Sequence, residues 1–395
     1  MTTSTIPIGP FHPLQEEPEL FRLHVDGETV VDVDVEIGWN HRGIEKVSEG
    51  KTFDQVPFLV ERICGICSTS HPIAYVQAVE DAGHLEVPER ALYIRSIIAE
   101  LERLHSHLLW VGLAGHFLGY NTVFMWAWKY REPVLDICEE LTGNRNNYAM
   151  IKVGGVRRDL DESKFPGVLG RLDELEKKVK MLAGAVTDDP VLHARLKGVG
   201  VLTEEAARDY GALGPTVRGS GIPWDVRADE PYAAYDLVDW DIITAPSCDV
   251  YGRAVVRVLE CFESIEIIRQ CFENMPEGDI DANVTEIPPG EGIGHAEAPR
   301  GETFHYVRSD GTNQPVRHKA RAPTYMNLPT CYETVVGESV TDATIILASV
   351  DPCYSCTERM GVVYDASSGE RLLDGKELVR LSQEKTEALR REMGR

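Results

Sequence analysis

The sequence predicts an α+β fold that is predominantly helical, with an N-terminal β-hairpin or sheet region packed on a central bundle of long helices. Three patterns support this class: apolar alternation near the N-terminus, apolar residues at three- and four-residue steps through the middle, and frequent Pro and Gly after residue 276. We therefore expect an N-terminal β region (1–50), a helical catalytic core (51–359) with an irregular β and loop segment at about 276–350, and a C-terminal extension (360–395).

The N-terminal β region has the pattern of two paired strands. Apolar residues alternate with polar ones on both sides of Asp26-Gly27, namely Phe21, Leu23, Val25, Val31, Val33, Val35 and Ile37. An Asp-Gly dipeptide between two alternating runs indicates a hairpin, because Gly tolerates the positive φ of a tight turn.

Helical periodicity dominates the core. Helices are predicted to begin near Pro88, to cover 129–142 as a short element, to include 172–182, and to run from about 248 to 273. The continuous apolar run at 344–350 predicts a buried strand that leads directly into Asp351-Pro352-Cys353.

Composition describes an acidic globular protein. Apolar residues make up 43% of the chain, and the formal net charge is −24, which argues against a nucleic-acid binder because phosphate recognition needs a basic face. The N-terminus has no basic-then-apolar signal sequence. The stretch 108–128 lacks charges and could span a bilayer, but its glycines, His116 and Asn121 indicate a buried core segment instead. Membrane association is expected only through partner proteins.

Two Cys-x-x-Cys pairs, Cys64/Cys67 and Cys353/Cys356, lie near opposite ends of the chain. A tight turn aims both sulfurs of a pair in one direction, and four thiolates suit zinc, nickel or iron in a cluster. An odd cysteine count of nine without a signal sequence argues against a disulfide framework. The other cysteines have no paired spacing and are interpreted as small buried residues: Cys138, Cys248, Cys261, Cys271 and Cys331.

The separation of the pairs favours a functional metal centre. Zinc ribbons place their pairs about 15 to 20 residues apart, whereas closing a loop as long as this one costs an unfolded chain roughly 5 kcal/mol. We therefore expect a large scaffold that brings an N-terminal and a C-terminal turn together around a buried site. Structural zinc, and redox or chance pairs, remain as alternatives.

The residues around the pairs resemble the two cysteine signatures of nickel–iron hydrogenase large subunits. The first signature, Arg-x-Cys-Gly-x-Cys-x-x-x-His, is matched by Arg62, Cys64, Gly65, Cys67 and His71. The second, Asp-Pro-Cys-x-x-Cys-x-x-Arg, is matched by Asp351, Pro352, Cys353, Cys356 and Arg359.

Four further stretches, at 9–13, 41–46, 102–107 and 154–159, resemble one branch of that family. This branch contains the membrane-bound, energy-converting hydrogenases and their relative, the 49 kDa quinone-site subunit of complex I. The complex I subunit lacks the four cysteines, so the resemblance favours the hydrogenase side.

The resemblance implies a nickel–iron centre whose iron carries carbonyl and cyanide ligands. All four thiolates would bind nickel, with Cys67 and Cys356 also bridging to iron and with Cys64 and Cys353 as terminal ligands. The implied reaction is the reversible, heterolytic conversion of H2 into two protons and two electrons by a membrane-associated, ion-translocating complex.

The resemblance also assigns roles to residues outside the pairs. Glu45 matches the acid of an Arg-Gly-x-Glu motif and is the candidate proton relay, with a surface salt bridge to Lys46 or Arg42 as the alternative.

A second group of assignments concerns the surroundings of the metals. Arg321, near Pro323 in the same cofactor-binding stretch, resembles the arginine suspended over the metals, and Asp351 would orient it. Arg62 is expected to lower the proton affinity of the thiolates. His71 is expected either to hydrogen-bond a thiolate or to be an ordinary core histidine.

The C-terminal extension has two interpretations. In relatives, a maturation protease removes such an extension once nickel is inserted, which here would cut between Arg359 and Met360. The alternative is an ordinary C-terminal helix, since 378–391 is a good helix former, and some relatives of this branch dispense with cleavage.

The implied partners are a small subunit with a proximal 4Fe-4S cluster, ferredoxin-like iron–sulfur subunits and membrane ion-translocating subunits, because the sequence has no further cysteine cluster for an electron relay. The chain would then lie peripherally on the cytoplasmic side of the membrane.

The alternatives to a hydrogenase are a complex I-like quinone- or sulfur-reducing subunit without hydrogenase activity, and a structural zinc scaffold. His12 is present in the Gly-Pro-x-His-Pro turn used for quinone, but 70–73 lacks the matching tyrosine.

Overall fold

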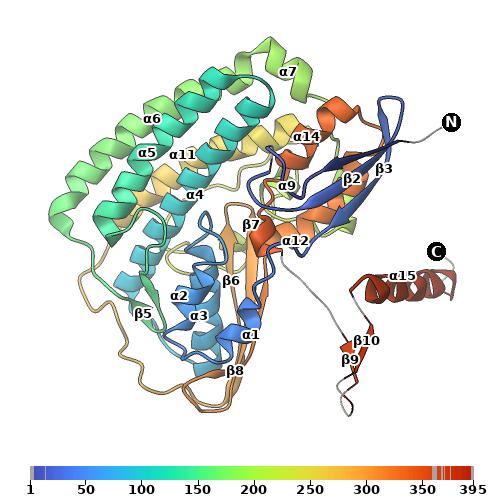
Figure 1. Ribbon diagram of the computed structural model, residues 1–395. Coiled ribbons are helices and arrows are strands. Elements are labelled where there is room, and N and C mark those ends of the chain that lie inside the picture. Colours follow the sequence, from blue (N-terminus) through green and yellow to red (C-terminus); the bar gives the residue numbers. More distant parts are fainter. Residues whose placement is uncertain are drawn as a thin grey trace.

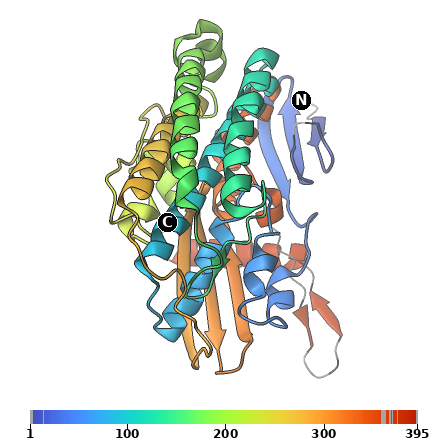
Figure 2. The same ribbon diagram turned by 90° about the vertical axis from the view of Figure 1, so that its left-hand side faces the viewer.

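Long helices form one side of the molecule and two small antiparallel sheets form the other (Figures 1 and 2). The computed structural model describes residues 4–13, 15–357, 363–365, 368, 370–373 and 375–392. Figure 1 shows the bundle of α4, α5, α6 and α11 at the upper left, the sheet β1–β2–β3 at the upper right and the sheet β6–β7–β8 below. This arrangement confirms the predicted α+β, predominantly helical class.

The bundle consists of α4 (Glu89–Phe117), α5 (Asn121–Thr142), α6 (Phe165–Asp188) and α11 (Val250–Asn274). Asp249 caps α11 by accepting a hydrogen bond of 2.9 Å from Gly252 N, as expected of an N-cap carboxylate. The short helix predicted at 129–142 in fact begins at Asn121. The chain turns at Gly119, which has a φ of 81°, so the charge-free stretch 108–128 is divided between two helices.

None of the helices in the described ranges has an apolar stretch long enough to cross a membrane.

The predicted N-terminal hairpin is confirmed and gains a third strand. β1 (Ser4–Ile8), β2 (Leu20–Asp26) and β3 (Thr29–Glu36) form an antiparallel sheet in that order. Gly27 turns the chain between β2 and β3 with a φ of 66°. Phe21 and Leu23 on the inner face belong to one core with Ile345 and Ile346. The sheet is therefore anchored on the segment that precedes the second cysteine pair.

The segment predicted to be irregular at about 276–350 contains a regular sheet. β6 (Gly290–Ala298), β7 (Gly301–Ser309) and β8 (Pro315–Arg321) are antiparallel neighbours. The prediction underestimated this order because glycine at alternate positions of β6 resembles loop composition. Those glycines have a packing role: a Cβ on Gly294 would lie 2.2 Å from Ala74 O, and one on Gly292 would lie 2.2 Å from Ala78 O.

Helix α3 (Ser70–Gly83) therefore lies directly on the backbone of β6. Because α3 begins three residues after Cys67, this close packing positions the first cysteine turn against the second sheet.

The prediction of a buried strand at 344–350 is wrong, because this segment lies in helix α14 (Val340–Ser349) and the residue after it. A continuous apolar run does not distinguish a buried strand from a buried helix. The deciding local signal is Ser339, whose hydroxyl accepts a hydrogen bond of 3.3 Å from Thr341 N at the N-terminus of the helix.

Short elements connect these parts. They are α1 (Ile44–Ser48), α2 (Val56–Val60), β4 (Ile151–Lys152), β5 (Gly155–Val156), η1 (Glu162–Lys164), α7 (Pro190–Leu196), α8 (Glu204–Asp209), α9 (Pro215–Arg218), α10 (Val226–Asp229), α12 (Pro323–Asn327), η2 (Leu328–Thr330), α13 (Cys331–Thr334) and η3 (Tyr354–Cys356). The C-terminal β9 (Val363–Tyr364), β10 (Arg371–Leu373) and α15 (Gly375–Glu392) are drawn apart from the other elements in Figure 1.

Candidate metal centre

The first cysteine turn connects α2 to α3, and Glu102 of α4 holds its C-terminal end. One carboxylate oxygen of Glu102 accepts a 3.1 Å hydrogen bond from Ser70 N, and the side chain also accepts from Thr69 N and the Ser70 hydroxyl. Burial raises the pKa of Glu102 to about 7. A fully buried acid thus satisfies the amide groups at the start of α3 and fixes Cys67 relative to the bundle.

The second cysteine turn follows α14 and is short. Asp351 has a positive φ of 55°, which redirects the chain out of the helix. Cys353 N donates to Thr324 Oγ1 over 3.1 Å, and Ser355 N donates to Glu17 Oε2 over 2.6 Å. This turn is therefore held by side chains that are distant in sequence.

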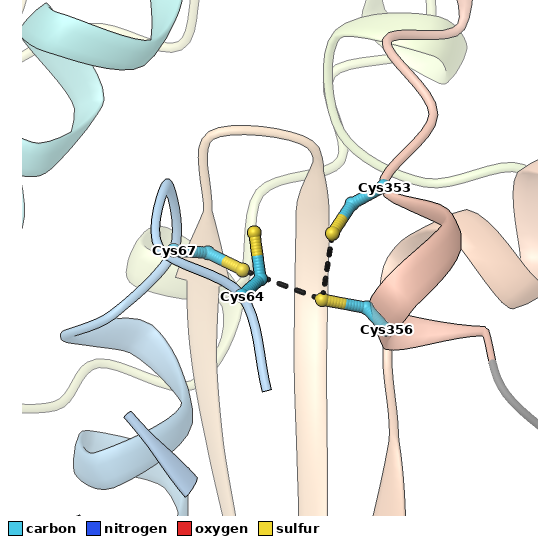
Figure 3. Close-up of side chains that lie close together, drawn as sticks. All are labelled: Cys64, Cys67, Cys353 and Cys356. Atoms are coloured by element: carbon cyan, nitrogen blue, oxygen red, sulfur yellow. Dashed lines mark hydrogen bonds between the residues drawn. The ribbon is translucent and has the colours of Figure 1, made fainter. Parts of the chain in front are cut away.

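The structure brings the four sulfurs together (Figure 3). All four Sγ atoms lie within 4.8 Å of one another, and all four residues are buried. Cys67 Sγ is 3.5 Å and Cys353 Sγ is 2.9 Å from Cys356 Sγ. Thiolates around one tetrahedral ion would lie about 3.8 Å apart, so this donor set fits a thiophilic metal with small adjustments.

The four buried thiols differ in how readily they lose a proton. Hydrogen bonds from Cys353, Cys356 and Cys67 hold the pKa of Cys64 well below its usual range, whereas burial raises the pKa of Cys353 and Cys356. Four thiols this close together favour one thiolate among them. Only a cation that displaces protons can stabilise all four as thiolates.

Arg300, at the turn between β6 and β7, supplies the buried positive charge beside the sulfurs. Its Nε donates to Asp351 O over 2.8 Å, and its Nη2 lies 2.8 Å from Asp351 Oδ1. Although burial opposes the charge, the neighbouring Asp351, Cys353 and Cys64 raise the pKa of Arg300. Arg300 follows Ala298-Pro299 and has no distinctive local signal in the sequence that would predict this role.

Arg321, the arginine expected over the metals, is engaged elsewhere. Its Nη2 pairs with Glu302 at 2.5 Å, and its guanidinium lies 5.8 Å from the centre of the Phe304 ring. Asp351 consequently orients Arg300 rather than Arg321. Pro323, two residues on, is buried in the first turn of α12.

Arg62 also points away from its expected role. Its Nη1 donates to Phe58 O over 2.6 Å and lies 3.3 Å from Glu61, and 57% of the side chain is exposed. The guanidinium that influences the pKa of Cys64 is that of Arg300. The flanking position of Arg62 in sequence did not translate into proximity in space, because the turn directs its side chain outward.

His71 contacts a sulfur and begins a chain of buried hydrogen bonds. Its Nε2 is 3.4 Å from Cys356 Sγ, and its Nδ1 is 3.0 Å from His305 Nε2. His305 Nδ1 is 2.8 Å from His318 Nε2, and His318 Nδ1 is 2.7 Å from Ser48 Oγ. Burial lowers the pKa of His318 to about 4, so this ring is neutral at pH 7. Partners on β7 and β8 thus orient the His71 ring toward the site.

Glu45 lies on a cavity of about 240 Å³ whose wall also includes His71 and Cys356. The carboxylate pairs with Lys319 Nζ at 2.7 Å and accepts from Ala320 N at 3.1 Å. The salt bridge considered as an alternative is therefore present, but with Lys319 instead of Lys46 or Arg42.

Two further carboxylates near the sulfurs were not identified from the sequence. Glu16 Oε2 is 3.9 Å from Arg300 Nη2, and loss of hydration raises the pKa of Glu16 to about 7. Burial and the nearby Cys64 raise the pKa of Glu17. Their only sequence signal is their position just after the Gly-Pro-x-His-Pro turn.

The predicted cleavage position, Arg359–Met360, lies outside the described residues.

Two family models match the chain. The model for the 49 kDa subunit of respiratory-chain NADH dehydrogenase matches residues 118–289 and 282–359, and the model for nickel-dependent hydrogenase matches residues 42–113. The first cysteine pair thus falls in the hydrogenase match and the second in the complex I match.

Similar proteins extend over nearly the whole chain. The membrane-bound hydrogenase subunit alpha of Pyrococcus furiosus is 42% identical over 401 residues, covering 97% of this chain and 93% of the relative. The carbon monoxide-induced hydrogenase of Rhodospirillum rubrum is 42% identical over 361 residues, covering 91% of this chain and 100% of the relative.

A solved structure of the membrane-bound sulfane sulfur reductase, an archaeal respiratory membrane complex, contains a chain that matches with a TM-score of 0.85 and 31% identity. The match covers 90% of this chain and 98% of that one. The buried four-cysteine site, the fold and these matches agree: the chain belongs to the oxidoreductase family that unites nickel-dependent hydrogenase large subunits with the 49 kDa subunit of respiratory complex I.

Proposed function

We propose that this chain is the catalytic large subunit of a membrane-associated nickel–iron hydrogenase that interconverts H2 with two protons and two electrons. The observation that carries the proposal is the convergence of four buried cysteine sulfurs within 4.8 Å. A subunit whose metal site had been lost would have no need to keep four thiols together in a dry interior, where burial opposes their ionisation.

Cys64, Cys67, Cys353 and Cys356 would hold a nickel–iron centre with carbonyl and cyanide ligands, and this centre would supply the redox chemistry that cleaves or forms H2. The hydrogen bond of His71 to Cys356 would adjust the electron density on that sulfur. Arg300 would place a fixed positive charge in a water-poor site, where electrostatic stabilisation is strongest.

Three carboxylates are candidates for receiving the proton. Glu16 and Glu17 lie near Arg300 and the second cysteine turn, and Glu45 lines the cavity that reaches Cys356. An acid with a pKa near 7 can both accept and release a proton at neutral pH. This property supports Glu16, whose pKa is about 7, alongside the motif-based assignment to Glu45.

The proposed setting follows the relatives. A small subunit with a proximal 4Fe-4S cluster would receive the electrons, ferredoxin-like subunits would exchange them with a donor, and membrane subunits would couple the reaction to ion movement. The chain would then lie peripherally on the cytoplasmic side of the membrane. The membrane-bound hydrogenase and the membrane-bound sulfane sulfur reductase named above support the association with a membrane complex.

Reduction of a sulfur compound is a second candidate function. The cavity beside Cys356 is lined by Arg42, Lys46, Arg317 and Lys319, and such basic side chains suit an anionic sulfur chain. The similarity to a chain of the sulfane sulfur reductase supports the same alternative.

The deciding experiment is metal analysis of the purified complex combined with hydrogen–deuterium exchange. We expect about one nickel per complex, with iron in excess because of the iron–sulfur subunits, together with exchange activity. Nickel and exchange activity should both be lost in Cys64→Ala and both be kept in the control Cys138→Ala, since Cys138 is a buried cysteine of α5 outside the four-sulfur cluster. Zinc without nickel would refute the proposal. Sulfide production from polysulfide without hydrogen exchange would favour the second candidate.

A further inference from the structure

Ser355, the residue just before Cys356, is held at both of its backbone polar groups by side chains from the N-terminal part of the chain. Its N–H donates to Glu17 Oε2 over 2.6 Å, and its carbonyl oxygen accepts from Arg42 Nη2 over 3.2 Å. No other described residue of this turn is bonded by the N-terminal region in this two-sided way. Glu17 and Arg42 therefore both hold the residue that precedes Cys356.

Arg42 also binds the first cysteine turn. Its Nη2 donates to Ile63 O over 2.7 Å and its Nη1 to Arg62 O over 2.8 Å, while its Nε donates to Asn40 O over 3.1 Å. One guanidinium thus joins the carbonyl that precedes Cys64 to the carbonyl that precedes Cys356. The planar fork of arginine, with five N–H donors, can satisfy several acceptors at once, which a lysine ammonium cannot do in the same geometry.

The other end of the second turn is held differently. Arg300 binds Asp351 O, and Thr324 binds Cys353 N. Both of these residues are in or beside the buried sheet region, whereas Arg42 is exposed on the wall of the cavity next to Cys356. The Cys353 end of the turn is therefore held by buried partners, whereas the backbone of Ser355 is bonded by the exposed side chain of Arg42 and the half-buried side chain of Glu17.

We propose that Arg42 and Glu17 form a latch that closes the Cys356 end of the second turn over the metal site, and that opening this latch exposes the thiols of Cys353 and Cys356 to incoming metal. The inference rests on the proposed function, because the turn is argued to hold the metal centre. Arg42 and Glu17 act through the backbone of Ser355, so they are positioning residues.

The test is pulsed alkylation of the full-length, metal-free chain with iodoacetamide, with each cysteine quantified by mass spectrometry. In Arg42→Gln, we expect Cys353 and Cys356 to react roughly tenfold faster than in the unaltered chain, the effect of losing one or two hydrogen bonds to a charged group. Cys138 and Cys261, buried in α5 and α11, should keep their slow rates.

Three further variants give the latch a distinctive pattern. In Arg42→Lys, Cys353 and Cys356 should react as fast as in Arg42→Gln, because one ammonium cannot join both turns. Alkylation of Cys353 and Cys356 should be fast in Glu17→Ala. It should stay slow in Glu17→Gln, because the amide oxygen of the glutamine still accepts the Ser355 N–H. The control Arg208→Gln removes an exposed arginine that pairs with Glu204 four residues away and should be indistinguishable from the unaltered chain.

Two results would overturn the latch. One is an unchanged rate at Cys353 and Cys356 in Arg42→Gln. The other is an equal acceleration at Cys138 and Cys261, which would mean that Arg42 only stabilises the whole fold. Because the readout is thiol exposure in the metal-free chain, it is independent of whether nickel or zinc occupies the site, and so failure of the latch and failure of the hydrogenase proposal are separate outcomes.

Discussion

The two cysteine turns have the same spacing but are built in different ways. The first lies between α2 and α3, where the buried carboxylate of Glu102 from α4 accepts hydrogen bonds from Thr69 N and Ser70 N. The second follows α14 and depends on side chains from the N-terminal loop, from the β6–β7 turn and from α12, represented by Glu17, Arg300 and Thr324. The first turn is bonded to a neighbouring helix, and the second turn is bonded to three segments that are separate in the sequence.

This difference indicates an order of assembly. A turn that is stabilised by adjacent helices can form when those helices pack, whereas one that needs Glu17, 338 positions from Ser355, can form only after the two ends of the chain have come together. The first pair would then be a preformed half-site, and the second pair would complete it.

The largest effect is expected from removing a ligand from either turn. Cys67→Ser and Cys356→Ser should each lower nickel content and hydrogen–deuterium exchange by more than roughly 100-fold, because a hydroxyl is a poor ligand for a thiophilic metal. Metal analysis and exchange assays of the complex measure both. If one serine variant kept nickel while the other lost it, the two turns would not contribute equally to one site.

The anchor of the first turn should matter for stability. Glu102→Ala leaves the buried Thr69 and Ser70 amide groups without an acceptor and should lower the free energy of unfolding by about 3 kcal/mol. Urea unfolding of the full chain provides the measurement, and Glu205→Ala on an exposed helix end serves as the control. A loss no larger than in the control would show that Glu102 does not hold the turn.

The anchor of the second turn should matter more for catalysis than for stability. Arg300→Lys keeps the charge but not the paired contact with Asp351, and should reduce exchange activity by about 100-fold while nickel remains bound, as expected for an electrostatic group in a dry site. The matched variant Arg321→Lys, which alters the pair with Glu302, should have little effect. The opposite ranking would restore Arg321 as the arginine of the site.

The smallest effect is expected at the cavity wall. Glu45→Gln should lower turnover by roughly tenfold with nickel retained, less than a typical acid–base residue contributes because Glu16 and Glu17 provide other proton acceptors. Lys319→Met removes the ion pair but keeps the Glu45 carboxylate. Comparing the turnover of the two variants therefore separates the role of Glu45 as a proton relay from its role as an ion-pair partner. Unchanged turnover in Glu45→Gln would remove the relay assignment.

Local patterns predicted most of the elements. Alternation around Asp26-Gly27 and the three- and four-residue periodicity of the bundle depend only on neighbouring residues, and both are confirmed. The predictions failed where an apolar run or a glycine-rich run has two local interpretations. Only packing of 344–350 in the core and of Gly292 and Gly294 against α3 decides between them.

For the site, the sequence by itself determined the four cysteines and their two pairs, because each pair is confined to one short turn. It left His71 between a thiolate contact and an ordinary core role, and the structure shows the contact with Cys356. Tertiary structure alone decided which charged groups surround them. Arg300 pairs with Asp351, Glu16 lies 3.9 Å from Arg300, and Glu17 binds Ser355 N next to Cys356, whereas Arg62 and Arg321 turn to other partners. The physical reason is that a long charged side chain samples a wide volume, and only the burial and pairing of the folded chain fix where its charge lies.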